Sequence, residues 1–200
     1  MAPPTKITFS ERELKLAQDK EIILTKTALL QKVAALLEQR VAIIKNLVTG
    51  SLQDERLHYA LPKIARGENY NGYPYLMMDY PSVFGKEDIF ALRTMFWWGH
   101  FCSITLQLSG SFLNEYRGRI RTRLQNNPAD FFICVSSDPW KHDFAEDNYR
   151  PATDLQGAGG TWLFEKNFMK VALKYDLQQL ESMDLLLDDA YVKILELVKD

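Results

Sequence analysis

The sequence predicts an α+β protein. We expect an antiparallel sheet of about five to six strands, flanked by a long N-terminal helix, a middle helix and a C-terminal helix. Apolar residues recur at helical spacing over residues 19–48 and 177–198, and they alternate with a period of two over residues 90–108. The elements do not follow a regular strand–helix–strand repeat, which argues against a parallel sheet. A length of 200 residues with ordinary globular composition suits one domain, residues 1–200.

The N-terminal segment predicts helices. Residues 1–9 are expected to form an extended lead-in, because Ser10 and Glu13 have the spacing of a capping box for a helix that begins there. Residues 19–48 predict one long helix or two joined helices, which Thr49-Gly50 would end. The apolar stripe of this segment is wide, which favours core packing. A homodimer seam through the same helix is the alternative.

Residues 52–80 give weaker signals. A short helix is expected within residues 52–66, ending before Gly67. Residues 67–74 are rich in turn formers and tyrosine and predict a loop. Residues 75–80 predict a short strand that Pro81 ends, since proline cannot donate to a strand ladder.

Residues 89–108 are the most apolar β segment. The even positions from Phe90 to Leu108 form one apolar face and are expected to be core, with His100 and Cys102 buried among them. A single strand over this span would exceed the usual limit of about 10 residues. Gly99 is therefore expected to turn a hairpin or to bend one strand at a bulge, and the length favours the hairpin.

The remaining chain predicts a helix, strands and a closing helix. Residues 111–125 have a helical apolar side, and residues 131–135 form an unbroken apolar run that is typical of a buried strand. Residues 136–160 are a long polar loop that includes a glycine-rich stretch, 157–160. Strands are expected at 161–164 and 168–175, followed by a helix over 177–198.

Composition and motifs narrow the function classes. The formal net charge of −2, from 24 basic and 26 acidic residues, lacks the basic excess of a nucleic-acid binder. No apolar run reaches the ~18 residues of a spanning helix, and the N-terminus lacks a signal-peptide core, so we expect a soluble cytoplasmic protein without a membrane partner. Cys102 and Cys134 lie in apolar runs and predict buried free thiols. No metal site, dinucleotide fingerprint or phosphate-binding loop is present, so no cofactor is expected.

The odd positions of the apolar β segment need an explanation. Arg93, Met95, Trp97 and Phe101 form a second face that is too apolar to be left in water. A helix, the 136–160 loop or another subunit would have to cover it. Our first hypothesis is a non-catalytic binding or interaction protein that uses this face and the loop for a small-molecule or protein ligand. Arg93, Trp97 and Tyr73 are the candidate ligand contacts.

The main alternative is an enzyme that acts on a small anionic substrate. Arg117 and Arg121 stand four apart on a predicted helix and would clamp the anion, because guanidinium groups suit carboxylate and phosphate. His142 and Asp143, within the polar loop, would handle protons. This alternative requires Arg117 or Arg121 to converge with His142 on one concave pocket. A solvated helix face, paired with acidic neighbours, is the simpler interpretation of the arginines.

Overall fold

A computed structural model describes residues 6–155 and 166–199. Its helices are α1 (Glu11–Gln18), α2 (Lys20–Ser51), α3 (Glu55–His58), α4 (Gly110–Asn126) and α5 (Met183–Glu196). Its strands are β1 (Lys63–Tyr70), β2 (Tyr73–Phe84), β3 (Ile89–Trp97), β4 (Phe101–Ser109), β5 (Phe132–Cys134), β6 (Tyr149–Pro151) and β7 (Phe168–Asp176). The strands form one sheet in the order β1-β2-β3-β4-β7-β5-β6, and each neighbouring pair is antiparallel. The predicted α+β class is confirmed, with seven strands in the described sheet.

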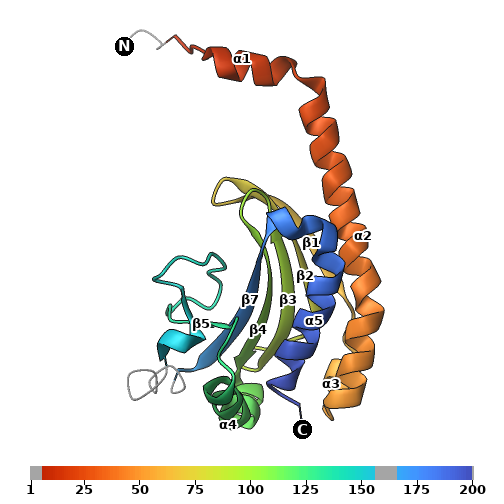
Figure 1. The fold of residues 1–200 in the computed structure, drawn as a ribbon, viewed down its shortest axis with the longest axis vertical. Helices are drawn as coiled ribbons and strands as arrows, with labels where there is room; N and C mark the ends of the chain where they lie inside the picture. Colours follow the sequence, from red (N-terminus) through yellow and green to blue (C-terminus); the bar gives the residue numbers. More distant parts are fainter. Residues whose placement is uncertain (1–5, 156–165, 200) are drawn as a thin grey trace.

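Helices α2, α4 and α5 supply the apolar side chains that cover one face of the sheet (Figure 1). The even positions of β3 and β4 lie in this core, as the alternation predicts: Phe90, Leu92, Phe96, Cys102, Ile104, Leu106 and Leu108. The helices contribute the matching apolar stripes, including Leu37 of α2, Tyr116 of α4 and Leu187 of α5. Periodicity alone therefore identified the packed face of the sheet.

Helix α2 confirms the predicted long helix but continues past its expected end. Asp19 caps it, accepting hydrogen bonds from the backbone N–H groups of Glu21 and Ile22. The helix runs through Gly50 to Ser51, where Val48 and Leu52 are buried. A helical glycine costs about 1 kcal/mol, whereas burying one large apolar side chain contributes about 1.5–3 kcal/mol. Packing therefore outweighs the stop signal at Thr49-Gly50.

Helix α3 confirms the short helix predicted within residues 52–66, whereas the β1–β2 hairpin corrects the predicted loop over residues 67–74. Only the short α3 is helical in this region, and β1 runs through Gly67 to Tyr70. Asn71 and Gly72 both have positive φ, 50° and 88°, and form a two-residue turn before Tyr73. An Asn-Gly pair between two strands is the strongest short-range hairpin signal. The sequence therefore contained this signal within the predicted loop.

Strand β2 does not end at Pro81, which corrects the second prediction in this region. It continues to Phe84, and its register against β3 shifts between Asp79 and Ser82. A residue without an N–H donor is tolerated where the ladder is already interrupted. The proline therefore marks an irregularity inside the strand rather than its end.

Strands β3 and β4 form the favoured hairpin. Gly99 has a φ of 73°, the N–H of His100 donates to the carbonyl of Trp97, and Trp97 pairs with Phe101. His100 corrects the prediction of burial: it is exposed at the turn and stacks on the Trp97 ring, with ring centroids 3.7 Å apart. The alternation of faces holds only within a strand, so it does not predict the burial of His100, which lies in the turn.

The other elements follow the predictions closely. Helix α4 and strands β5 and β7 are confirmed, and the C-terminal helix begins as a 3-10 segment, η3 (Leu177–Ser182), before α5. The predicted 136–160 loop contains β6 and a short 3-10 segment, η1 (Ala152–Leu155). The predicted strand at 161–164 and the glycine-rich stretch 157–160 lie outside the described residues. Within the described ranges, no helix has the length and apolar character that crossing a bilayer requires.

Candidate binding site beneath the covering loop

The second face of the sheet is lined by polar side chains at its centre. Strand alternation places them opposite the helix-covered core, because their neighbours in sequence are core residues. They come from β2, β3, β4 and β7: Asp79, Arg93, Thr105, Gln107 and Lys170. Arg93, Gln107 and Lys170 are all less than one-tenth exposed. Such burial of polar side chains on a sheet face requires a cover.

Residues 136–148, here called the covering loop, provide that cover. The Tyr70 hydroxyl accepts hydrogen bonds from the backbone N–H groups of His142 (2.7 Å) and Asp143 (3.2 Å). The ammonium of Lys170 donates to the Lys141 carbonyl. The ring of Phe144 contacts Phe101 of β4 at 4.9 Å between centroids. Of the three covers left open by the sequence, the loop therefore occupies this part of the face.

Trp97 and Tyr73 differ in how much surface they offer a ligand. Trp97 is 5% exposed, donates from its indole N–H to the Tyr70 carbonyl, and packs between Tyr70 and Phe101. Tyr73 is 45% exposed, with its ring edge against Trp97 and His100. Trp97 is therefore part of the packing that supports the loop, and Tyr73 keeps accessible surface.

Arg93 organises the polar centre of the face. Its guanidinium donates to both carboxylate oxygens of Asp79, at 2.7 and 3.0 Å, and the two side chains are 8% and 13% exposed. A third contact joins Arg93 Nη1 to His142 Nε2 at 3.1 Å. A guanidinium has no acceptor, so His142 Nε2 accepts and the ring proton is assigned to Nδ1.

His142 is held as a neutral acceptor. Burial lowers the pKa of His142 to about 3, and the positive charges of Arg93 and Lys170 lower it further in the same direction. A general base works best with a pKa near the working pH and a free lone pair. His142 has neither, because its Nε2 lone pair accepts from Arg93.

Lys170 is a fully buried lysine whose one hydrogen-bond acceptor among the described residues is the Lys141 carbonyl. It forms no ion pair with a carboxylate in the described part of the chain. Burial lowers the pKa of Lys170 to about 8, and the nearby Cys134 partly opposes this effect. At neutral pH Lys170 is therefore a buried cation without a counter-charge in contact.

Two further buried polar atoms near Lys170 lack partners among the described residues. Gln107 lies directly opposite Lys170 in the β4–β7 register, is 2% exposed, and has no hydrogen-bond partner for Nε2. The Tyr149 hydroxyl approaches Thr105 without reaching hydrogen-bond geometry. Leaving a buried donor unpaired costs about 1–3 kcal/mol, so such groups are rare in native proteins.

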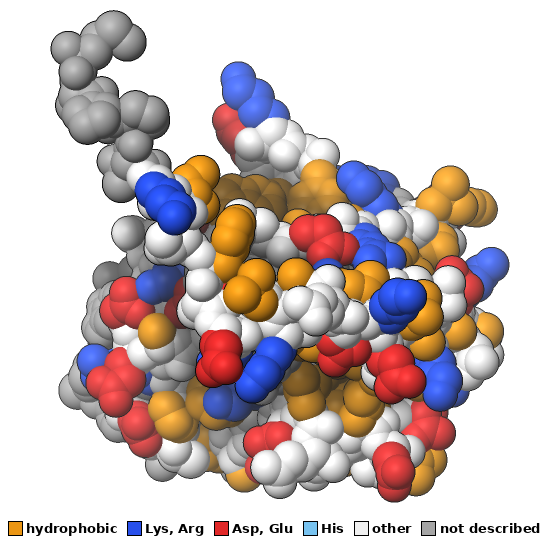
Figure 2. All heavy atoms as spheres, turned by 90° about the horizontal axis from the view of Figure 1, so that it is seen from above, with side chains coloured by type: hydrophobic (Ala, Val, Ile, Leu, Met, Phe, Trp, Pro, Cys, Tyr) orange, Lys and Arg blue, Asp and Glu red, His pale blue; other side chains and the backbone are white. Residues whose placement is uncertain are grey.

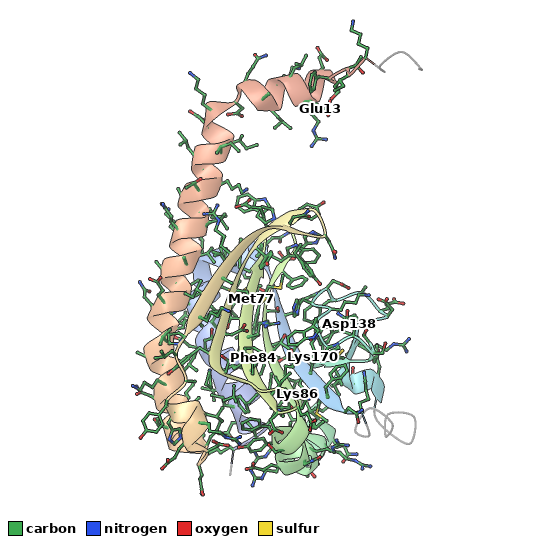
Figure 3. The ribbon with its side chains drawn as sticks, turned by 180° about the vertical axis from the view of Figure 1, so that it is seen from behind. Glu13, Met77, Phe84, Lys86, Asp138 and Lys170 are labelled. Carbon is green, nitrogen blue, oxygen red and sulfur yellow. The ribbon has the colours of Figure 1, made fainter. Side chains whose placement is uncertain are left out.

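Exposed apolar side chains border this polar centre. Trp140 of the covering loop and Phe84 of β2 are 49% and 47% exposed, and their ring centroids are 6.4 Å apart. The Arg93 guanidinium lies 6.0 Å from the centre of the Trp140 ring. Figure 3 views this face and shows Met77 and Phe84 on β2 and Lys170 on β7, with Asp138 of the loop on the side of Lys170. Strands β3 and β4 lie between β2 and β7. An apolar rim therefore adjoins a buried cationic centre.

Arg117 and Arg121 lie elsewhere, on α4. Arg117 Nη2 donates to the Lys166 carbonyl, and Arg117 borders a pocket of about 420 Å³ with Glu87 and other residues. The described lining of this pocket does not include His142 or Asp143. Arg121 is exposed on the same helix. The convergence that the enzyme alternative requires is therefore absent from this pocket.

The thiols of Cys102 and Cys134 are expected to be inert in the folded protein. Both are buried and free, and burial raises the pKa of Cys102 to about 12 and raises the pKa of Cys134 above its ordinary value. Since the thiolate is the reactive form, an aromatic disulfide reagent should label neither residue until urea unfolds the chain. Absorbance at the released thiolate checks this, and rapid labelling of Cys134 in the folded protein would contradict it.

Among the described residues, no group of three or more His, Cys, Asp or Glu side chains is arranged to hold a metal ion. Comparison with protein-family models, curated proteins and solved structures finds no significant match. The function is therefore inferred from the geometry of the second face.

Proposed function

We propose that this protein binds a small molecule with an anionic head and an apolar body at the second face of the sheet. The observation that carries this proposal is Lys170, a fully buried cation without a carboxylate partner in the described chain. A buried charge is costly unless it is paired. An anionic head supplies the missing counter-charge.

The polar centre suits such a head in charge and in donors. Lys170 and Arg93 contribute two positive charges, and Asp79 neutralises one of them. Asp138 and Asp143 raise the pKa of Lys170 through space, yet neither forms an ion pair with it. The free Nε2 of Gln107, across from Lys170, adds a neutral donor. A buried cation with further hydrogen-bond donors beside it is typical of a site that binds a carboxylate or phosphate.

The rim suits an apolar body. Trp140, Phe84 and the half-buried Met77 lie beside the polar centre on the same face. Binding sites for small molecules combine apolar walls with a few polar groups that fix orientation. The head would then face Lys170 while the body covers surface that is now exposed to water.

Binding requires movement of the covering loop, because the Lys170 ammonium already donates its hydrogen bond to the Lys141 carbonyl of that loop. The loop is held there by side-chain contacts, the Tyr70 hydroxyl and the Phe144 ring among them, and it does not pair with the sheet as a strand. Loops that cover a ligand open and close in many proteins, because they are not part of the hydrogen-bonded sheet or helices. The ligand head would replace the Lys141 carbonyl as the acceptor from Lys170.

The same groups favour binding over turnover. His142 is a poor base, because its pKa lies near 3 and its lone pair accepts from Arg93. Cys134 is a poor nucleophile, because burial raises the pKa of its thiol. The groups of this face therefore favour a binding role over the enzyme alternative.

Three matched probes test the proposal in solution: octanoate, acetate and 1-octanol. Octanoate has both head and body, so it should bind in a calorimeter and raise the melting temperature. Acetate and octanol each lack one part and should bind at least ~10-fold more weakly, a difference of about 1.4 kcal/mol. Octyl phosphate, in place of octanoate, distinguishes a phosphate head from a carboxylate. Failure of both octanoate and octyl phosphate to bind would overturn the proposal.

Variants assign the binding to this face. Lys170→Met should abolish octanoate binding while circular dichroism stays unchanged, since methionine fills similar volume without charge. Lys174→Met is the matched control, because Lys174 lies on the same strand and face but is exposed. Trp140→Ala should weaken octanoate binding and leave acetate unaffected. Equal binding by wild type and Lys170→Met would also reject the proposed site.

A further inference from the structure

Residues 6–25, here called the N-terminal arm, extend beyond the rest of the molecule. They comprise the lead-in to α1, α1 itself and the start of α2, and every side chain among them is exposed. In Figure 1 this arm stands clear of the sheet and of the other helices. It carries seven large apolar side chains that are 44–79% exposed: Ile7, Phe9, Leu14, Leu16, Ile22, Ile23 and Leu24.

The packing stripe of α2 continues into this arm. Leu30, Leu37 and Ile44 are spaced by seven residues and are at most 2% exposed against the core. Ile23 is the next residue of the same series and is 61% exposed. Helix α2 therefore extends a face suited to burial beyond the body that would bury it.

The middle of α2 borders an apolar groove. Glu38 and Val41 of α2 line a groove of about 450 Å³ together with Ile64 of β1 and Pro62 just before that strand. Leu61, next to Pro62 in the chain, is 82% exposed. One helix thus has an exposed apolar arm at its start and an apolar groove beside its middle.

A single exposed face of α2 connects these two features. Its residues are spaced alternately by four and three: Leu24, Ala28, Gln31, Ala35, Glu38, Ala42 and Lys45. The three alanines lie seven residues apart, and small side chains at a contact allow two helices to approach closely. A second α2 in antiparallel orientation, centred near residue 33, would place Leu24 of one copy opposite Ala42 of the other. The same register places Glu21 opposite Lys45, an attractive pair.

We propose that the N-terminal arm docks on a second copy of this chain, with the two α2 helices antiparallel. In this two-fold arrangement each arm fills the groove of the other copy, so both unpartnered surfaces are buried by one contact. Such isologous dimers are the commonest soluble oligomers. A standard stable interface buries about 800 Å² per partner, and the seven exposed apolar side chains of the arm would supply apolar surface for it.

The charges of the arm also fit a second copy. The arm has four basic and four acidic residues: Lys6, Arg12, Lys15, Lys20, Glu11, Glu13, Asp19 and Glu21. Figure 2, which looks down on the molecule from the side of the arm, shows hydrophobic side chains among charges of both signs. A helix that binds an anionic membrane or nucleic acid needs a basic excess. An equal number of basic and acidic side chains suits a second copy of this chain, whose arm carries the same charges and can pair with them.

The mass in solution tests the proposal. Light scattering and sedimentation of the full chain should give twice the mass of one chain. The exposed double variant Ile23→Glu with Leu24→Glu should raise the dimer dissociation constant ~100-fold or more while the circular dichroism is kept. Leu185→Glu, 68% exposed on α5, is the matched control and should remain dimeric. A monomeric wild type at high micromolar concentration would overturn the proposal.

Crosslinking tests the orientation. Leu24→Cys with Ala42→Cys should form disulfides between copies, while Leu24→Cys alone should not. Within one chain these positions are 18 residues, about 27 Å, apart along the helix and cannot be joined. Dimers crosslinked by Leu24→Cys alone would indicate parallel helices and reject this arrangement. Flotation with anionic phosphatidylserine vesicles, if it depends on Ile23 and Leu24, would instead assign the arm to a membrane surface.

Discussion

Replacing Asp79 by alanine is expected to lower the free energy of unfolding by about 3–5 kcal/mol, because it leaves the Arg93 guanidinium buried without its counter-charge. The pair is bidentate, and its side chains are only 8% and 13% exposed. Denaturation by urea, followed by circular dichroism and tryptophan fluorescence, measures the change.

Two further variants separate the charge effect from general damage. Asp189→Ala removes the exposed ion pair with Lys193, whose side chains are 58% and 41% exposed, and should cost ~0.5 kcal/mol or less. Asp79→Leu with Arg93→Met removes both charges of the buried pair and should recover part of the loss. If Asp79→Ala lowers the free energy of unfolding as little as Asp189→Ala does, the Arg93 guanidinium is not buried with Asp79 as its counter-charge.

Acid should destabilise the protein through His142 between about pH 6.5 and pH 3. Burial first, then Arg93 and Lys170, lowers the pKa of this histidine to about 3 in the folded chain. The unfolded chain binds the proton near the ordinary value of about 6.5, so protons favour unfolding throughout this window. The loss at pH 3 is on the order of 4 kcal/mol, because each pKa unit corresponds to about 1.4 kcal/mol.

A pH series of urea titrations isolates this effect. His142→Asn keeps an acceptor for Arg93 but removes the titration, so its stability should fall less steeply than that of the wild type below pH 6.5. Lys170 adds no slope there, since its pKa of about 8 leaves it protonated in both states. His100→Asn, at the exposed turn, is the control and should follow the wild type. Parallel curves for His142→Asn and the wild type would refute the assignment.

The sequence predicted the elements whose signal is periodic. Helix α2 and the β3–β4 hairpin follow from apolar spacing and from Gly99, because local pattern and core packing agree there. The β1–β2 hairpin was not predicted, although Asn71-Gly72 is a typical hairpin turn. The flanking tyrosines and polar residues show little of the apolar–polar alternation that predicts strands. Pro81 misled because a bulge in the β2–β3 ladder accommodates it, and register is not a local property.

The candidate site was predicted only in part. Arg93 was found because it stands on an apolar strand face that needed a cover. Lys170 and Gln107 lie on the same face of the sheet as Arg93. Polar residues at alternate positions of a strand, however, ordinarily predict a face that is exposed to solvent. Their burial depends on the covering loop and on the pairing of β4 with β7, about 60 residues apart in the chain, and loop-mediated contacts leave no periodic signal.

The strand order has a consequence for how the chain acquires this site. Strands β1 to β4 pair with their neighbours in sequence, so this meander can assemble from local contacts as it leaves the ribosome. Strand β5 is made before β7 but attaches to the sheet through β7. The β5–β6 hairpin and the covering loop between its strands must therefore wait for residues 168–176. During synthesis the polar face stays open to water until that last strand is inserted, and only then does Lys170 become a buried charge.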